Sequence, residues 1–217
     1  MWLRNLLNVG LKSQSKNTCL NIYFCAYLCI NKKEIKIMAT ETATKWVIDP
    51  MHSEVQFKVK HLVISTVSGF FKSFNGELLT DNDDFENAEI DFSLDINSID
   101  TNQTQRDEHL KSAEFFDAEK YPQITFKSTS FTKTDDEEYE LKGNLTIKDQ
   151  TKPVTLDVEF GGSAADFYGN TKAGFEISGK INRKDFGLTW DGVTEAGSIV
   201  VGEDIKLLIN IQFTKQA

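Results

Sequence analysis

The residues best suited to chemistry in this chain are few, and their spacing favours no metal centre. The three histidines are His52, His61 and His109, and all three cysteines precede residue 30. His52 and His61 are nine positions apart, and the segment around His109 reads DEHL rather than the HExxH of zinc enzymes. Structural zinc sites usually include cysteines, which the sequence after Met38 lacks. We therefore predict no metal site and no cofactor.

Nucleophilic catalysis has little more support. His52 and Ser53 are adjacent, but no G-x-S-x-G turn, which exposes the serine of many hydrolases, occurs in the chain. We predict no catalytic activity. The alternative that stays open is an enzyme acting on an isoprenoid or quinone, with His52, Arg106 and His109 meeting on one wall of a pocket.

A polar cluster, RDEHL at 106–110, suits binding better than catalysis. Arg106 and His109 are three residues apart and would share a helix face, where they could meet the polar head of a ligand. Alternatively, Arg106 pairs with a loop carboxylate and fixes the helix. The later motif NRKDFG supplies Arg183 and Asp185, which we expect to brace a turn. Together with His52 these residues are our candidates for a polar mouth.

The elements that must position these side chains read as β-strands. In EVQFKVKHL, apolar Val55, Phe57 and Val59 alternate with polar residues, the period of a strand with one buried face. Similar runs recur to the C-terminus between turn-forming segments, which predicts an all-β sandwich or barrel. One short helix is predicted at about 103–112, with Asn102 as its N-cap.

The 16 phenylalanines fill a core or line a space for something else. A closed eight-stranded barrel can be just filled by side chains or can hold one apolar ligand. Four glycines inside strand-like runs favour a cavity, because they remove volume from the interior; they are Gly69, Gly76, Gly143 and Gly179. In GFFKSFNGEL, Phe70 and Phe74 share the parity of one face, and Phe71 faces the other way unless a bulge intervenes.

Composition divides the chain near Met38. Residues 1–37 carry a net charge of +5. Because the whole chain has a net charge of −9, residues 38–217 carry −14. Such an acidic domain is a poor partner for nucleic acid. The apolar run 19–30 is too short for a transmembrane helix. We expect residues 1–37 to be an upstream extension and 38–217 to be one cytoplasmic domain with no transmembrane segment. The alternative is a signal segment and a periplasmic or secreted protein.

Four ordered motifs resemble the YceI-like family, over about residues 45–214. They are WVIDPMHSEVQFKVKHLVISTVSGFFKSFNGEL, RDEHLKSAEFFDAEKYPQITFKS, GNLTIKDQTKPVTLDVEF and FEISGKINRKDFGL. The resemblance implies a bacterial, lipocalin-like antiparallel β-barrel of eight strands with an apolar interior. It further implies that the barrel binds, stores or transports a polyprenyl chain, an isoprenoid quinone or a fatty-acid derivative. Carried over by motif, it singles out Asp49, His52 and Ser53; Arg106, Asp107 and His109; and Asn182, Arg183, Asp185 and Phe186.

We predict that inward-facing residues of successive strands contact this ligand. They are Phe57, Val59, Phe71, Phe92, Leu94, Phe126, Leu145, Leu156, Phe175, Ile177 and Phe186. A structural or partner-binding barrel with a filled core is the remaining alternative, and a homodimer through an exposed strand or aromatic patch stays open.

Overall fold

The computed structural model describes residues 43–192 and 200–216, which are mostly strand. The strands are β1 (Thr44–Ile48), β2 (Glu54–His61), β3 (Ser65–Phe71), β4 (Phe74–Thr80), β5 (Glu89–Asp95), β6 (Ile99–Asp100), β7 (Gln123–Lys133), β8 (Glu138–Ile147), β9 (Gln150–Ala165), β10 (Thr171–Asn182) and β11 (Val201–Lys215). The helices are α2 (Thr104–Lys111) and the short 3-10 turns η1 (Pro50–His52), η2 (Ile96–Ser98) and η3 (Arg183–Phe186).

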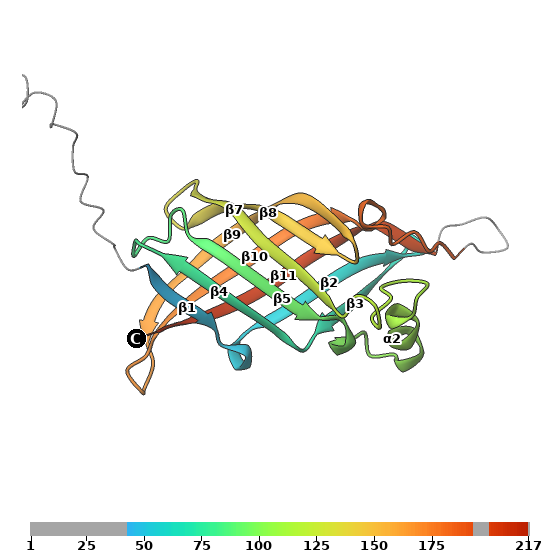
Figure 1. The fold of residues 1–217 in the computed structure, drawn as a ribbon, viewed down its shortest axis with the longest axis horizontal. Coiled ribbons are helices and arrows are strands. Elements are labelled where there is room, and N and C mark those ends of the chain that lie inside the picture. Colours follow the sequence, from blue (N-terminus) through green and yellow to red (C-terminus); the bar gives the residue numbers. More distant parts are fainter. Residues whose placement is uncertain (1–42, 193–199, 217) are drawn as a thin grey trace, which may run out of the picture. The chain divides into compact units, whose positions relative to one another are not determined.

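These strands form one closed barrel (Figure 1). Around the barrel, three of the positions are each occupied by two consecutive strands that are separated by a short interruption. At these positions β1 continues as β2, β3 as β4, and β5 as β6. All neighbouring strands are antiparallel, and the ring closes where β1 and β2 both pair with β11. If each interrupted pair is counted as one strand, the barrel has eight strands. The prediction of a closed, lipocalin-like, eight-stranded antiparallel barrel is therefore confirmed.

The interruptions change which side chains point inward. Between β3 and β4 the chain leaves the ladder at Lys72 and Ser73, so the alternation restarts. Phe71 and Phe74 are both buried, at 8% and 7% exposure, whereas Phe70 is only half-buried. The expectation that Phe70 and Phe74 share a face is therefore wrong, because it assumed one unbroken strand.

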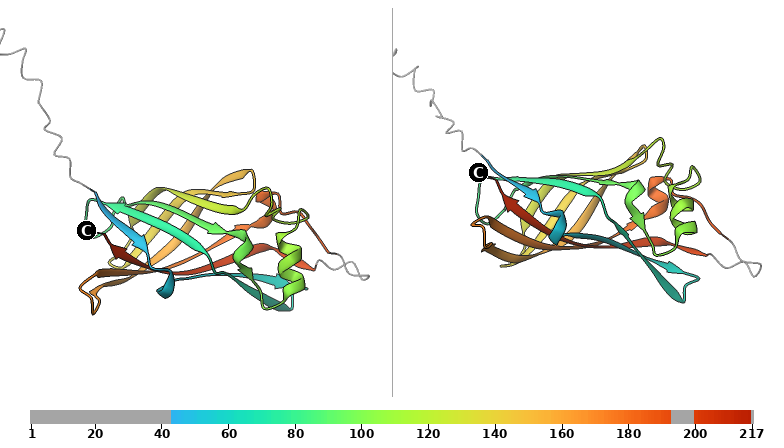
Figure 2. Two further views of the ribbon diagram at one scale, coloured as in Figure 1. Left: turned by 60° about the horizontal axis from the view of Figure 1, so that its bottom comes forward. Right: turned by 90° about the horizontal axis from the view of Figure 1, so that it is seen from below.

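Helix α2 confirms the helix predicted at about 103–112, but its cap differs. The side chain of Gln103 accepts a hydrogen bond from the backbone N–H of Arg106, so Gln103 and not Asn102 is the N-cap. Asn102 has a φ of 59°, in the left-handed region that asparagine tolerates, and its N–H donates to Asp100. The helix lies at one end of the barrel, as Figures 1 and 2 show.

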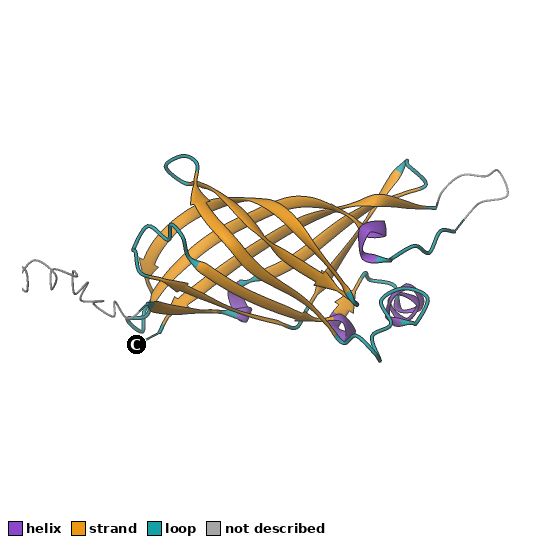
Figure 3. Ribbon diagram, turned by 45° about the horizontal axis from the view of Figure 1, so that its top comes forward, coloured by secondary structure: helices purple, strands orange, loops and turns teal. Residues whose placement is uncertain are grey.

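Aromatic side chains close the opposite end. Phe85, from the β4–β5 loop, is 1% exposed and lies within 5.5 Å, centroid to centroid, of Trp46, Phe160 and Phe175. The Tyr139 hydroxyl donates to the carbonyl of Asp84 and holds this loop over the end of the barrel. In Figure 3 the strands form the wall and α2 lies at the other end. The barrel is therefore plugged at one end and covered by a helix at the other.

The predictions about residues 1–37 lie outside the described residues. The translation start at Met38, and the cytoplasmic or exported location that depends on it, therefore stay predictions. Among the residues that the structure describes, no helix is long and apolar enough to cross a membrane.

Candidate functional site

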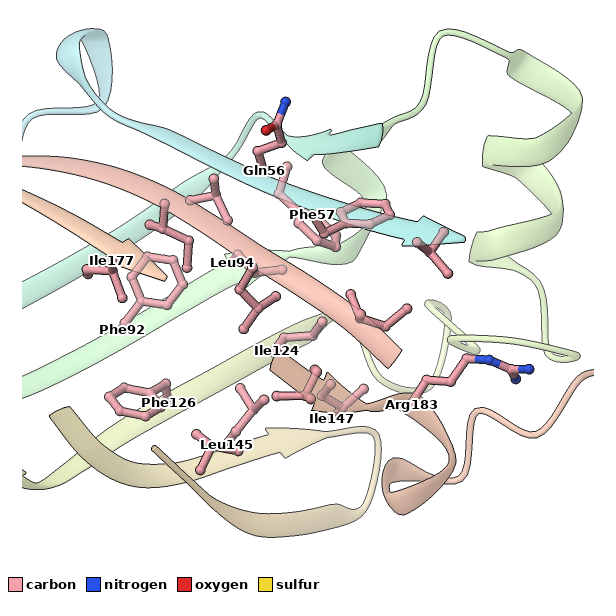
Figure 4. A pocket seen from close by; sticks show the side chains of 18 of the residues that line it. Gln56, Phe57, Phe92, Leu94, Ile124, Phe126, Leu145, Ile147, Ile177 and Arg183 are labelled. Atoms are coloured by element: carbon pink, nitrogen blue, oxygen red, sulfur yellow. The ribbon is translucent and has the colours of Figure 1, made fainter. Parts of the chain in front are cut away.

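A cavity of about 570 Å³ occupies the barrel interior. Its wall is built almost entirely from the inward-facing apolar side chains of the strands, since alternate residues of each strand point into the lumen. Every predicted lumen residue except Phe186 lines it: Phe57, Val59, Phe71, Phe92, Leu94, Phe126, Leu145, Leu156, Phe175 and Ile177. Figure 4 shows several of these side chains directed into the same space from different strands, with Arg183 toward one end.

The cavity is long. Six residues of the single strand β11 line it, from Val201 near the α2 end to Phe213 near the plugged end; the others are Ile205, Leu207, Ile209 and Ile211. Twelve residue steps along a strand cover about 40 Å at 3.3 Å each, which a strand tilt of about 40° reduces to about 30 Å along the barrel axis. A space of this length and volume fits one extended chain molecule and lies in the size range of small-molecule sites.

Inward-facing glycines keep large side chains flat against the wall. A Cβ on Gly69 would lie 2.3 Å from the Phe57 ring, and one on Gly143 would lie 2.3 Å from the Phe126 ring. Gly76 and Gly179 are covered in the same way, by Ile48 and Leu156. Each glycine thus gives its neighbour a recess beside the wall, and the centre of the lumen stays open.

A polar network fixes α2 at the mouth of the barrel. The guanidinium of Arg106 donates to the hydroxyl of Thr101 at 2.7 Å and to its carbonyl at 2.6 Å. Asp107 accepts from the backbone N–H of Thr101 at 2.9 Å and from its hydroxyl. Thr101, which is 4% exposed, therefore anchors the helix. Arg106 pairs with this threonine and not with the loop carboxylate of the alternative interpretation, and it still lines the cavity.

His109 lies one helical turn further on and joins α2 to the segment after η3. Its ring meets the indole of Trp190 edge-on, with centroids 4.9 Å apart, and its Nε2 lies 3.0 Å from a carboxylate oxygen of Glu114. Both His109 and Trp190 line the cavity. The pair thus bridges the mouth between the helix and the chain leading from η3 to β11.

Arg183 holds the other side of this bridge. It is 1% exposed, and its guanidinium donates to the carbonyls of Leu188, Trp190, Gly202 and Val201 and to the carboxylate of Asp191. A buried charge needs such partners, because an unpaired one would be strongly destabilising. The arginine therefore fixes Trp190 and the start of β11, and we interpret it chiefly as a structural residue that also reaches the cavity wall.

Three of the predicted ligand-contact and polar-mouth residues lie away from the cavity lining. Phe186, the last residue of η3, is 2% exposed in the core, and Asp185 of the same turn is exposed. His52 is exposed on η1, where its Nδ1 lies 2.9 Å from Asp49. Burial acts to raise the pKa of Asp49, but hydrogen bonds from His52, Lys172 and the Met51 N–H outweigh it and lower the pKa to about 2.

This geometry bears on the enzyme and metal alternatives. Only Arg106 and His109 of the proposed catalytic set line the cavity, whereas His52 belongs to the separate cluster around Asp49. The described residues contain no group of three or more His, Cys, Asp or Glu side chains placed to hold a metal ion. The arrangement of side chains is best suited to binding, through the burial of apolar surface.

Several cavity residues were missed from the sequence. Leu110, Phe115, Phe116 and Trp190 all line the mouth. The first three fall in the segment RDEHLKSAEFFD, where a helix followed by an irregular turn hides any period, and Trp190 stands alone between glycines. The weak signal for all four was their size, since large apolar side chains in a polar segment need a place to be buried.

Comparisons with known proteins agree with this architecture. A model of the YceI-like domain matches residues 46–213. The YceI protein of Salmonella newport is 39% identical over 165 residues, which are 76% of this chain and 83% of that protein. The crystal structure of the YceI protein of Campylobacter jejuni is 36% identical and covers 73% of this chain and 90% of its own, with a TM-score of 0.62.

A more distant structure shares the fold alone. The polyisoprenoid-binding domain from Saccharophagus degradans, implicated in plant cell wall breakdown, is 14% identical, covers 79% of this chain and 98% of its own, and has a TM-score of 0.58.

Proposed function

The chain belongs to the YceI-like family, and on that premise we propose that it binds one long-chain apolar molecule inside its barrel, without catalysis. The ligand class is a polyprenyl chain, an isoprenoid quinone or a fatty-acid derivative, and the role is to store or carry it. One observation supports this most strongly, namely the continuous apolar lumen that runs along β11 from Val201 to Phe213.

Apolar burial supplies the binding free energy. Each methylene group removed from water contributes about 0.8 kcal/mol, so affinity should rise with chain length until the lumen is full. A linear chain matches the lumen better than a compact ring system does, because the lumen is long and its wall carries few polar groups. The plug around Phe85 sets the end of the chain's path.

The polar groups of the site gather at the mouth, which suits a ligand with one polar end. Arg106 uses two of its donor nitrogens on Thr101, which leaves further N–H groups for an oxygen of the ligand. His109 and Gln105 line the same region. In this proposal the hydrocarbon lies toward Phe85 and a quinone, carboxyl or amide head lies beside α2.

The recessed aromatic rings argue against a filled core. If the interior served packing alone, side chains in place of Gly69 and Gly143 would fill it, as close packing in protein cores requires. Instead these glycines let the rings of Phe57 and Phe126 lie against the wall. The lumen is thus shaped to remain open to a guest.

A chain-length series tests the proposal. Unlabelled fatty acids and polyprenols of increasing length would compete with a fluorescent polyene fatty acid for the full-length protein. We expect affinity to increase with each added methylene and then to level off. The variant Leu145→Asp, which places a carboxylate on the apolar wall, should lower affinity at every length, whereas Thr155→Asp on the exposed face of β9 should not. If none of the chains binds, whatever its length, the proposal is contradicted.

A further inference from the structure

The tip of the β2–β3 hairpin exposes apolar residues beside the mouth of the lumen. Val63 is 80% exposed and Ile64 is 85% exposed. The backbone N–H of Leu62 donates to the carbonyl of Val200, and Val200 lines the cavity together with His61 and Val201. Figures 1 and 2 both place the end of this hairpin at the α2 end of the barrel. The tip therefore projects from the rim through which a ligand must pass.

The backbone of this tip is strained. Leu62 has a φ of 49° and Val63 a φ of 66°, in the left-handed region. His61 pairs with Ser65, so the loop has three residues, and at positions with positive φ asparagine and glycine are favoured, because leucine and above all β-branched valine adopt this conformation at a cost. Folding stability alone would favour asparagine or glycine at these two positions. The presence of Leu62 and Val63 therefore indicates a role other than stabilising the barrel.

A row of lysines crosses the outer wall behind the tip. Lys180 lies directly opposite Lys206, and Lys206 lies directly opposite Lys58, on the neighbouring strands β10, β11 and β2. Their strand neighbours line the lumen, so the lysines point outward. Like charges directly opposite each other destabilise a sheet. Such a row is unexpected in a chain of net charge −9.

Little within the barrel neutralises this row. Lys180 pairs with Asp204 at 2.8 Å, but none of the ion pairs among the described residues involves Lys58, Lys60 or Lys206. Lys60 and Lys58 lie one and three residues before His61, the last residue of β2, which is about 3 and about 10 Å from the start of the tip at 3.3 Å per residue. The wall formed by β2 and β11 thus combines an apolar tip with unpaired positive charge, which complements an anionic surface.

Exposure alone is not the argument, as the opposite end of the barrel shows. Phe167 and Tyr168, in the β9–β10 turn, are 106% and 90% exposed. That turn is held by hydrogen bonds to the carboxylate of Asp166 and lies at the plugged end, away from the mouth. It therefore serves as an internal control for an exposed apolar tip without the lysine row and without access to the lumen.

We propose that the β2–β3 tip and the lysine row dock the mouth of the barrel onto an anionic phospholipid bilayer. Val63 and Ile64 enter the boundary between headgroups and acyl chains, and Lys58 and Lys206 of the row, together with Lys60 further along β2, contact the headgroups. The inference rests on the proposed function, because its purpose is to pass an apolar chain between bilayer and lumen. A chain that leaves the bilayer at such a contact avoids the cost of exposing each methylene to water.

Flotation of the full-length protein with vesicles tests the docking. One vesicle set contains phosphatidylcholine alone, and the other contains equal parts of phosphatidylcholine and phosphatidylglycerol. We expect the protein to float with the anionic vesicles. The variant Leu62→Asn, Val63→Gly, Ile64→Thr should bind them at least about ten-fold more weakly and should keep or raise its melting temperature, since asparagine and glycine tolerate the positive φ of positions 62 and 63.

Two further variants separate the parts of the surface. Lys58→Gln with Lys206→Gln should weaken binding to anionic vesicles by about five-fold per lysine. The matched control Phe167→Asn with Tyr168→Gly should bind as the unchanged protein does. Docking is overturned if the unchanged protein does not float with anionic vesicles, or if the tip variant floats equally well.

Binding of a fluorescent polyene fatty acid in solution, without vesicles, distinguishes the two proposals. The tip and lysine variants should keep this affinity but should acquire the fatty acid from anionic vesicles more slowly. Binding in solution without vesicle docking would overturn the docking inference and leave the proposed function standing. Vesicle docking without any binding in solution would overturn the proposed function and retain the membrane surface.

Discussion

Substitution of Gly69 by alanine should narrow the lumen and weaken binding of long chains. The added Cβ would lie 2.3 Å from Cζ of Phe57 and 2.9 Å from Cγ2 of Thr101. Thr101 is held by Arg106 and Asp107, so the Phe57 ring is the group that must yield. Restoring an ordinary contact of about 3.7 Å requires a shift of about 1.4 Å, away from the wall and into the cavity.

The size of the effect follows from that shift. A ring displaced by about 1.4 Å takes up roughly the room of two methylene groups, which corresponds to about 1.6 kcal/mol of lost burial, or roughly 15-fold in affinity. The overpacked wall should also lower the free energy of unfolding by about 1–3 kcal/mol. Competition against a fluorescent polyene fatty acid measures the affinity, and thermal denaturation followed by circular dichroism measures the stability.

Two further variants make the prediction sharp. Gly174→Ala is the matched control, because a Cβ at Gly174 meets nothing within 4 Å, and it should leave affinity and stability nearly unchanged. Adding Phe57→Leu to Gly69→Ala should restore part of the affinity, since leucine has no ring to displace. A folded Gly69→Ala protein that binds the longest chains as tightly as the unchanged protein would refute the reasoning.

Three other predictions concern stability. Arg183→Lys leaves several buried carbonyls without their donor and should lower the free energy of unfolding by about 3 kcal/mol in urea titrations; an unchanged midpoint would contradict this. The lowered pKa of Asp49 means that its contribution, about 2 kcal/mol, is complete above pH about 4 and is lost as the pH falls toward 2. Asp49→Asn should remove that part of the acid dependence, and parallel curves for both proteins would count against it. Phe85→Ala should lower the free energy of unfolding by about 3–5 kcal/mol, which chemical denaturation measures. It should also open the plugged end of the barrel, so that the chain length with the highest affinity increases.

Much of the fold could be predicted because its signal is local. The alternation of Val55, Phe57 and Val59 depends only on strand geometry, and all three line the lumen. Pattern alone left a sandwich and a barrel as alternatives, and the resemblance to the YceI-like family decided between them. Helix α2 was predictable for the same local reason, although its cap is Gln103 because Asn102 occupies a left-handed turn.

The misses depend on contacts between distant residues or on breaks in the strands. The parity of Phe71 and Phe74 changes where the chain leaves the ladder, which no periodicity records. Phe85 lies in the polar segment TDNDDFEN, and only the folded loop, with φ of 60° at this residue, turns it into the barrel end. Trp190 meets His109 across the mouth, a contact between segments about eighty residues apart that single-sequence reasoning cannot anticipate.

Native mass spectrometry of the full-length protein tests the central claim most directly. The sample would be measured as purified, after extraction with organic solvent, and after incubation with isoprenoid quinones and fatty amides. We expect an added mass on the folded protein that solvent releases and that a hydrocarbon-rich ligand restores in a ratio of one to one. A bare protein mass in all three samples would contradict the proposal that the lumen binds an apolar chain.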